Sequence, residues 1–191
     1  MRVIAGQYRR RQLRTLPGLK LRPTSDRLRE TLFDVLAAGE LPLENSTWFD
    51  LFAGSGAIGI EALSRSANMV YFAESHRAAA TVIHQNMSSL GIKSCYEIIE
   101  LDANKALRQL AKRAVQCDFC FLDPPWADAA AYSGALGALT NLAVMKPSSI
   151  VIAEHDRHYD PGGAFAGASV TLRRFRKLEQ GDAALSFYCL S

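Results

Sequence analysis

The strongest constraint on the fold is a regular alternation of apolar, strand-like segments with helical patterns, which starts at Thr47. Strands are predicted at residues 47–52, 69–74, 96–100, 119–122 and 149–154. Helical patterns lie between them, at residues 56–65, 84–90, 103–114 and 132–142. This order produces right-handed βαβ units, and therefore predicts an α/β fold with a mostly parallel sheet that helices cover on both faces.

The chain ends with a different pattern. Residues 169–175 and 184–190 are both strand-like, and no helical pattern separates them. We therefore expect an antiparallel hairpin at the edge of the sheet. A mostly parallel sheet completed by an antiparallel C-terminal hairpin resembles the class I, Rossmann-like methyltransferase fold.

A glycine-rich turn follows the first predicted strand. Its glycines satisfy the GxGxxG pattern, which alone would also suit a dinucleotide. Asp50, however, precedes the first glycine by four residues, and a carboxylate there disfavours a pyrophosphate while it suits the ammonium and sulfonium groups of S-adenosyl-L-methionine. The residues predicted to bind this cofactor are Asp50, Ala53, Gly54, Ser55, Gly56 and Gly59.

Two further acidic positions follow the next two predicted strands. Glu74 ends the second strand, where its carboxylate could accept hydrogen bonds from ribose hydroxyls. Asp102 and Ala103 follow the third strand, at the place where class I methyltransferases usually recognise the adenine amino group. A surface position for Glu74 and a helix N-cap for Asp102 are the structural alternatives.

The motif that decides the chemistry follows the fourth predicted strand: Asp123, Pro124, Pro125 and Trp126. An exocyclic base amine is a poor nucleophile because its lone pair is delocalised into the ring. The Asp123 carboxylate and the Pro124 carbonyl could accept hydrogen bonds from that amine, and two prolines fix φ without competing N–H groups. Trp126 could stack on the extracted base. We predict that these four residues catalyse methyl transfer to a base amine.

The N-terminal segment is strongly basic. Residues 1–30 contain nine basic and two acidic residues, whereas the remainder carries 13 basic and 17 acidic ones. Arginine side chains match phosphate geometry, so this imbalance favours a nucleic acid partner over a solvated charged surface. The residues predicted to bind RNA are Arg2, Arg9, Arg10, Arg11, Arg14, Arg22 and Arg27.

The length of 191 residues suits one domain with a full core. We predict a single methyltransferase domain over residues 1–191, with a basic arm or hairpin at residues 1–22 and a catalytic core at residues 23–191. The core starts with a helix that follows the N-cap cluster Arg22-Pro23-Thr24-Ser25-Asp26 and that should end near Gly39. Because the sequence lacks a secretory signal and a bilayer-spanning apolar run, we expect a cytoplasmic protein without membrane contact.

The cysteines include one CxxC pair, Cys117 and Cys120. The pair falls on a predicted strand, where residues three apart point to opposite faces, so we interpret both as core residues rather than as a metal or disulfide site. No metal ligands are predicted, and the four histidines have no ligand spacing.

Several motifs together carry a family resemblance. They are Arg2-Val-Ile-Ala-Gly6, Leu21-Arg-Pro-Thr-Ser-Asp-Arg27, Asp50-Leu-Phe-Ala-Gly-Ser-Gly56, Glu61-Ala-Leu-Ser-Arg65, Asp123-Pro-Pro-Trp126 and Gly181-Asp-Ala-Ala-Leu-Ser-Phe-Tyr188. On these motifs the chain resembles the bacterial 16S ribosomal RNA guanine-N2 methyltransferases of the RsmD type. The resemblance implies a monomeric enzyme that acts on 16S rRNA in a small-subunit assembly intermediate, with the arm engaging RNA.

The sequence departs from that family at two places. Trp126 stands where tyrosine is usual, which preserves stacking and loses any hydroxyl contact. Arg9, Arg10 and Arg11 are consecutive where the family often has a glycine among the basic residues, so the turn of the arm is expected to differ.

Three other functions fit part of the sequence. A DNA amino-methyltransferase acting on adenine N6 can share the aspartate-proline-proline-aromatic motif, but it typically needs a recognition region for which this chain has no room. A non-catalytic RNA-binding assembly factor would need neither the intact glycine turn nor the complete Asp123–Trp126 motif. A nicotinamide oxidoreductase would leave that motif and the basic arm unexplained.

The Asp123 carboxylate favours guanine over adenine as the methylated base. Guanine presents two adjacent donors, N1–H and the N2 amine, to one carboxylate.

Overall fold

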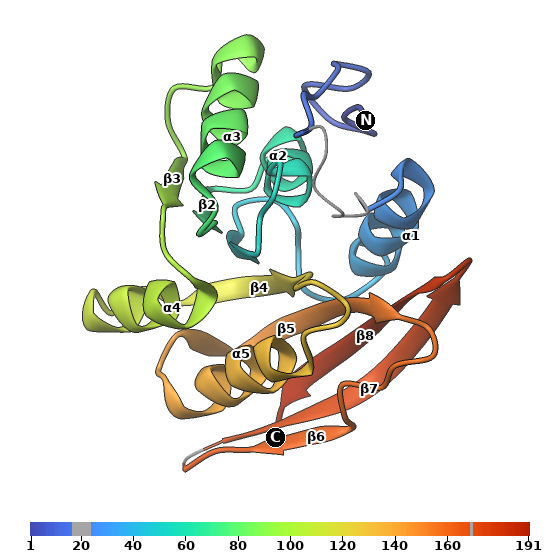
Figure 1. Cartoon of the computed structure of the whole chain (residues 1–191), viewed down its shortest axis with the longest axis vertical. Coiled ribbons are helices and arrows are strands. Elements are labelled where there is room, and N and C mark those ends of the chain that lie inside the picture. The colour runs from blue at the N-terminus through green and yellow to red at the C-terminus, as the bar shows by residue number, and fades with distance from the viewer. Residues whose placement is uncertain (17–23, 169) are drawn as a thin grey trace.

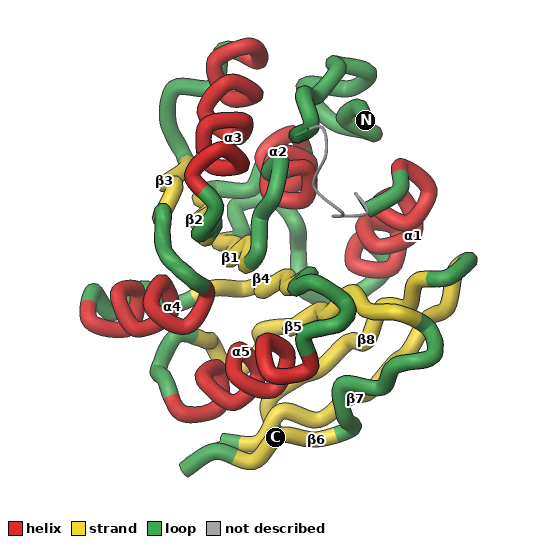
Figure 2. Tube along the Cα trace, viewed as in Figure 1, coloured by secondary structure: helices red, strands yellow, loops and turns green. Residues whose placement is uncertain are grey.

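The computed structural model describes residues 1–16, 24–168 and 170–191. An eight-stranded sheet, ordered β3-β2-β1-β4-β5-β8-β7-β6, forms its centre (Figures 1 and 2). The strands are β1 (Thr47–Leu51), β2 (Met69–Ala73), β3 (Tyr96–Ile99), β4 (Cys117–Leu122), β5 (Met145–Asp156), β6 (Ala164–Ala166), β7 (Thr171–Gln180) and β8 (Ala183–Leu190). The helices are α1 (Asp26–Ala37), α2 (Ala57–Ser64), α3 (Arg77–Leu90), α4 (Ala103–Lys112) and α5 (Ala129–Asn141).

The first five strands form the parallel half of the sheet. β1 pairs in parallel with β2 and β4, β2 with β3, and β4 with β5. Every residue of β4 is buried, as expected of a central parallel strand covered on both faces. The α/β fold predicted from the alternation of elements is therefore confirmed.

Helices cover the two faces of this sheet as two separate layers. α1, α2 and α3 pack on one face, and α4 and α5 on the other (Figures 1 and 2). In the first layer the Trp48 ring stacks between Phe33 of α1 and Phe119 of β4, with centroid distances of 5.4 and 4.6 Å. Its indole N–H donates to Ser46 Oγ at 2.8 Å. This aromatic stack fixes α1 to the centre of the sheet, against β1 and β4.

The C-terminal hairpin is present, but it does not form the edge of the sheet. β7 and β8 pair antiparallel, and β8 also pairs antiparallel with β5. The outermost strand is β6, which was not predicted and which pairs antiparallel with β7. Only three residues belong to β6, too few to give a strand pattern in the sequence. The edge position of the hairpin was therefore wrong.

Residues 1–16 form a short hairpin that is docked on the core. An antiparallel bridge joins Arg2 to Gln12. The buried carboxylate of Glu61 in α2 accepts the backbone N–H of Ile4 at 2.7 Å. The arm is thus a fixed part of the fold, held by a buried charge that the sequence alone did not single out.

Two residues with positive φ shape this hairpin. Gly6 has φ +79°, and a Cβ there would lie 1.8 Å from the carbonyl oxygen of Ser64, so a side chain at this position cannot be accommodated. Arg10 adopts φ +68° in the turn. This is the conformation that a glycine would take at low cost, and an arginine held there costs roughly 1–2 kcal/mol. The arm therefore forms its turn without a glycine among the three arginines.

Cys117 and Cys120 lie on the same face of the sheet, in the layer under α4 and α5. The expectation of opposite faces was wrong, because the register between β4 and β5 shifts between Cys117 and Phe119 and interrupts the alternation. Both thiols are free and buried, and burial raises the pKa of each.

Among the described residues, no group of three or more His, Cys, Asp or Glu side chains could hold a metal ion. No helix among the residues that the structure describes is long and apolar enough to cross a membrane.

Candidate active site

A pocket opens at the carboxyl ends of β1 and β4. It encloses about 670 Å³, including space open to solvent. Four predicted cofactor residues line it from the glycine turn, and Asp123 lines it from the end of β4. The four are Asp50, Ala53, Gly54 and Ser55. The glycine turn and the start of the Asp123–Trp126 motif therefore face one pocket.

The glycine turn depends on positive φ angles at particular residues and on a close approach between backbone and side chains. Gly54 and Gly56 have φ +55° and +78°, and Phe52, which is not a glycine, has φ +62°. A Cβ at Gly59 would lie 2.3 Å from Cε1 of the Phe72 ring. The described lining of the pocket does not include Gly56 or Gly59, so these two glycines act by shaping the turn and by letting α2 approach β2.

Asp50 is a buried carboxylate at the base of the pocket. Its Oδ2 accepts the backbone N–H of Gly59 at 3.0 Å. Burial raises the pKa of Asp50 to about 8; the Gly59 hydrogen bond lowers it, and the negative charge of Glu74 raises it further. A desolvated carboxylate next to an open pocket is a site for a positive charge, so Asp50 fits the cationic groups of S-adenosyl-L-methionine.

Glu74 supports the glycine turn from the end of β2. Its two carboxylate oxygens accept the backbone N–H groups of Gly54 at 2.8 Å and of His76 at 2.7 Å. Each oxygen retains acceptor capacity, so these bonds leave room for a ribose hydroxyl. Glu74 is nevertheless not part of the described lining of the pocket.

Asp102 is the N-cap of α4. Its Oδ1 accepts the backbone N–H of Lys105 at 3.0 Å, and the carboxylate forms an ion pair with the same lysine at 2.9 Å. Hydrogen bonds from Lys105 lower the pKa of Asp102. Neither Asp102 nor the buried Ala103 belongs to the described lining of the pocket. The capping interpretation thus accounts for the contacts that Asp102 makes.

Asp123 and Trp126 are joined by a hydrogen bond between their side chains. The indole is only a donor, so its N–H donates to the Asp123 carboxylate. Burial raises the pKa of Asp123 well above its usual range; the negative charge of Glu154 adds to this, and the Trp126 bond opposes it. Tryptophan therefore supplies a polar contact to the carboxylate in place of the hydroxyl contact that was expected to be lost.

The two proline carbonyls of the motif differ in their partners. The carbonyl of Pro125 accepts the backbone N–H of Asp128 at 2.8 Å. Among the described residues, the carbonyl of Pro124 has one long contact, of 3.5 Å, with the Tyr132 hydroxyl, which donates to the Glu154 carbonyl at 2.9 Å. Of these two carbonyls, that of Pro124 retains more capacity for a further donor, such as a base amine.

Glu154 is a buried residue near the site that the sequence did not reveal. Leu122 pairs with Ala153, so Asp123, which directly follows β4, lies beside Glu154 of β5. The Thr24 hydroxyl donates to Glu154 Oε2 at 2.6 Å, and Thr24 lines the pocket. A lone carboxylate on a strand gives no signal in one sequence; the strand order is needed to place it next to Asp123.

The predicted RNA-binding arginines separate into two groups. The Arg11 side chain donates to the Ser89 carbonyl at 2.7 Å, and that of Arg14 donates to Gln85 Oε1 at 3.3 Å. These two arginine side chains of the arm therefore contact helix α3. Arg22 lies outside the described residues. The other group lines a cleft between the arm and α1, and consists of Arg2, Arg9, Arg10 and Arg27.

Several lining residues were missed because they come from distant parts of the chain. The arm contributes three of them, and Ser55 Oγ donates to Met1 Sδ at 3.6 Å. Thr24 and Phe52 lay within motifs used for the family resemblance, without a role assigned to them. The lining residues that were not predicted are Met1, Thr15, Leu16, Thr24, Phe52, Ala57, Ile58, Ala79 and Phe121.

Comparison with known proteins places this site in a family. The family model described as "Conserved hypothetical protein 95" matches residues 1–189. A ribosomal RNA small subunit methyltransferase D from Haemophilus influenzae is 36% identical over 159 residues, which cover 82% of this chain and 79% of that protein. The chain belongs to the RsmD-type methyltransferase family.

Solved structures agree with this family. The protein yhhF of Escherichia coli has a TM-score of 0.78 at 30% identity, and the match covers 99% of this chain and 97% of that one. A hypothetical protein of Thermus thermophilus has the same fold, with a TM-score of 0.80 at 24% identity and 98% coverage of both chains. The methyltransferase class and the S-adenosyl-L-methionine cofactor predicted from the sequence agree with this RsmD-type family and its fold.

Proposed function

We propose that the chain methylates the exocyclic N2 amine of a guanine in 16S rRNA of the small ribosomal subunit. The observation that carries this proposal is the shared pocket: Asp50 and the glycine turn line it from β1, and Asp123 lines it from β4. A cation-binding carboxylate and an amine-binding carboxylate thus face the same space. The names of the curated relatives, ribosomal RNA small subunit methyltransferase D, support the choice of substrate.

The glycine turn has the properties that S-adenosyl-L-methionine requires. Gly54 leaves open space where a Cβ would lie, with the Phe52 carbonyl oxygen 4.0 Å away. Asp50 would bind a cationic group of the cofactor, and Glu74 would accept from its ribose. Asp102 and Ala103 would hold the adenine if they approach it on binding. The cofactor supplies an electrophilic methyl group on its sulfonium.

The Asp123–Trp126 motif would bind the base. The Asp123 carboxylate and the Pro124 carbonyl accept hydrogen bonds from the amine and orient its lone pair, and Trp126 stacks on the ring. Because burial and Glu154 raise the pKa of Asp123, its carboxylate is a strong proton acceptor once the amine is bound. We propose that Asp123 receives the proton that the nitrogen loses when the methyl group leaves the sulfonium sulfur and the new N–C bond forms, which would leave S-adenosyl-L-homocysteine as the second product.

Guanine fits this arrangement better than adenine. Its N1–H and N2 amine are adjacent donors, and one carboxylate can accept from both. Adenine has an acceptor nitrogen beside its amine, and this acceptor would face the Asp123 carboxylate unfavourably. Base choice therefore follows from the charge and acceptor character of Asp123.

The basic arm would engage the phosphates of the RNA. Arg2, Arg9, Arg10 and Arg27 share one cleft with Asp26 and Glu30, and Arg2 is ion-paired with Asp26 at 3.3 Å. The charges of Arg9, Arg10 and Arg27 can therefore act on one stretch of RNA backbone. The glycine turn, the Asp123–Trp126 motif and the arm all belong to one chain. We therefore propose that the enzyme acts as a monomer. A substrate in the small ribosomal subunit supports the proposal that the enzyme acts in the cytoplasm.

The test is to incubate the purified protein with labelled S-adenosyl-L-methionine and small ribosomal subunits that lack this modification, and then to identify the labelled nucleoside. Labelled N2-methylguanosine in 16S rRNA is the expected result. Label in adenine would overturn the base. Absence of label despite cofactor binding would favour a different nucleic acid, such as DNA, or an assembly factor without catalysis.

A further inference from the structure

A second basic segment lies on β7, outside the arm and the pocket. Arg173 and Arg176 are exposed, and neither has an ion-pair partner among the described residues. Between them lies Phe175, whose side chain is 55% exposed and is the one large exposed hydrophobic side chain in the described part of the chain. An aromatic ring next to arginines without ion-pair partners combines a stacking platform with phosphate-binding groups.

A β-bulge puts these side chains on one face. Arg174 pairs with Tyr188 and Arg176 with Phe187, so β7 contains one additional residue, Phe175, opposite β8. The Phe175 ring lies 6.2 Å from that of Phe187, tilted by 52°. Regular alternation would put Phe175 and Arg176 on opposite faces; the bulge instead brings both to the face that bears Phe187.

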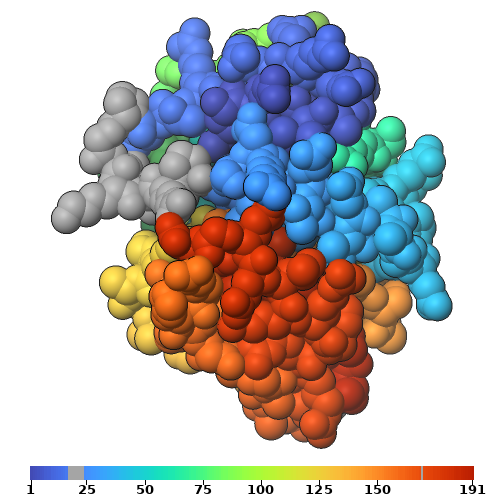
Figure 3. Space-filling model, turned by 90° about the vertical axis from the view of Figure 1, so that its right-hand side faces the viewer, coloured from blue at the N-terminus to red at the C-terminus, as the bar shows by residue number. Residues whose placement is uncertain are grey.

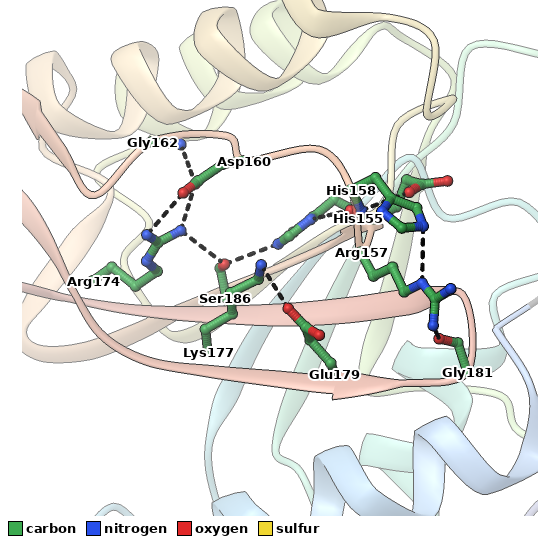
Figure 4. Close-up of polar contacts among 11 residues, drawn as sticks. His155, Arg157, His158, Asp160, Gly162, Arg174, Lys177, Glu179, Gly181 and Ser186 are labelled. Atoms are coloured by element: carbon green, nitrogen blue, oxygen red, sulfur yellow. Dashed lines mark hydrogen bonds and ion pairs between the residues drawn. The ribbon is translucent and has the colours of Figure 1, made fainter.

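The opposite face of β7 is already occupied by internal contacts (Figure 4). There Arg174 forms an ion pair with Asp160, and Lys177 forms one with Glu179 at 2.9 Å. Lys177 pairs in register with Ser186, which lies on this second face. Positive charge is therefore neutralised on one face of β7 and left available on the other.

The face with Phe175 is directed toward the same side of the sheet as α1. Phe187 and Leu185 of β8 pack in the core layer of α1 and α2. The space-filling view shows the N-terminal arm, α1 and the C-terminal hairpin on one side of the molecule (Figure 3). A nucleic acid chain bound at the arm could therefore continue across α1 to β7.

We infer that Arg173, Phe175 and Arg176 bind a single-stranded segment of RNA, with one base stacked on the Phe175 ring and phosphates contacted by the two arginines. This inference rests on the proposed function in that the partner is RNA. A second copy of this chain is disfavoured as the partner, because it would bring two arginine pairs together. The surface would thus add a stacking contact to the phosphate contacts of the arm.

The experiment measures the affinity of fluorescein-labelled oligouridylate of about 12 nucleotides, and the KM for unmethylated small subunits. Phe175→Ala should weaken oligouridylate binding by roughly 5- to 100-fold and raise KM while kcat stays unchanged, since Phe175 lies outside the pocket. Phe175→Trp should retain binding, and Phe175→Leu should lose it, because leucine is apolar but has no π face.

Salt dependence tests the arginines separately. Arg173→Ala with Arg176→Ala should reduce the slope of log K against log salt by about 0.7 per charge. Lys177→Ala is the matched control: it removes a cation of the same strand, but one that is paired with Glu179 on the other face, and it should leave affinity and slope unchanged. Melting temperatures close to wild type would show that the variants fold, as expected for exposed positions.

The inference fails if Phe175→Ala binds oligouridylate and subunits as the wild type does. It also fails if the wild type is a dimer in solution and Phe175→Ala is a monomer, because the face would then bind a second copy. Failure of the proposed function is distinguishable: the wild type would methylate no small subunits, whatever Phe175→Ala does to oligouridylate binding.

Discussion

The carboxylate of Glu61 accepts the backbone N–H of Ile4 at 2.7 Å and that of Ala5 at 2.9 Å. Glu61 is fully buried in α2, and its third partner is Arg65 at 2.9 Å. Because α2 begins directly after the glycine turn, this contact fixes the arm relative to the pocket. Met1, Thr15 and Leu16 of the arm then form part of the pocket lining.

Replacing Glu61 should therefore destabilise the protein and release the arm. Glu61→Ala leaves two backbone N–H groups without their acceptor and Arg65 without its partner, which should cost about 2–4 kcal/mol in the free energy of unfolding. Urea unfolding measures this, and limited trypsin digestion should show faster cleavage at the arm. Glu40→Ala, at an exposed position, is the control. Equal stability of the two variants would show that the buried contact is not needed.

Removing the Asp123 carboxylate should abolish methyl transfer and leave cofactor binding largely intact. Asp123→Ala removes the acceptor for the amine, and we expect a fall in kcat of at least about 100-fold. Asp123→Asn keeps the shape but replaces one acceptor oxygen with a donor. Single-turnover methylation and calorimetric titration with S-adenosyl-L-methionine separate the two effects. Loss of both activities together would mean that Asp123 is structural.

Trp126 should contribute to methyl transfer in two ways, through stacking of its ring on the base and through the hydrogen bond from its N–H to Asp123. Trp126→Phe keeps a stacking face and removes the hydrogen bond to Asp123, so activity should fall moderately and the pKa seen in the pH–rate profile should rise. Trp126→Ala removes both, with a loss of roughly 1–3 kcal/mol in base binding. Equal activities of the two variants would argue against stacking.

Asp50 should make cofactor binding and stability depend on pH. Its pKa is about 8 in the fold against an ordinary 3.8, so the folded chain holds a proton that the unfolded chain releases between these values. The free energy of unfolding contributed by this group therefore falls as pH rises through that window. A cation at Asp50 requires the ionised form, so S-adenosyl-L-methionine should bind more tightly as pH rises from 6 to 8, by about tenfold per pH unit at most.

Calorimetry across this pH range tests the role of Asp50. Asp50→Asn cannot ionise, so it should bind the cofactor weakly and show little dependence of affinity on pH. Its free energy of unfolding should also decrease less than that of the wild type between pH 5 and 8. A pH dependence of binding equal to that of the wild type would assign the proton to another carboxylate.

The arm arginines should differ in their contribution to RNA binding. Arg9 and Arg10 line the cleft beside α1, whereas Arg11 donates to the Ser89 carbonyl. Neutralising all three should weaken RNA binding and flatten its salt dependence, and Arg9→Ala with Arg10→Ala should account for most of the change. Fluorescence anisotropy at several salt concentrations measures the slope. An unchanged slope in the triple variant would reject the arm as the RNA contact.

The sequence by itself determined the elements of the parallel sheet and the order of the local motifs. Strand–helix alternation is a local pattern, so β1 to β5 could be placed within a few residues. The glycine turn and the Asp123–Trp126 motif were found because each function needs particular residues at close spacing. The strand irregularity at Cys117 and the three-residue β6 left no such pattern, and both were missed.

Tertiary structure decided what surrounds these motifs. Glu154 lies beside Asp123 only because β4 and β5 are neighbours, and Thr24 reaches Glu154 across 130 positions of the chain. Likewise, Phe175 and Arg176 share a face only because β7 bulges against β8. Hydrophobic periodicity reports which residues are buried locally, whereas contacts between distant segments depend on strand order and register. The sequence thus predicted the methyltransferase family and the residues proposed for its chemistry, whereas it did not predict the residues that surround them.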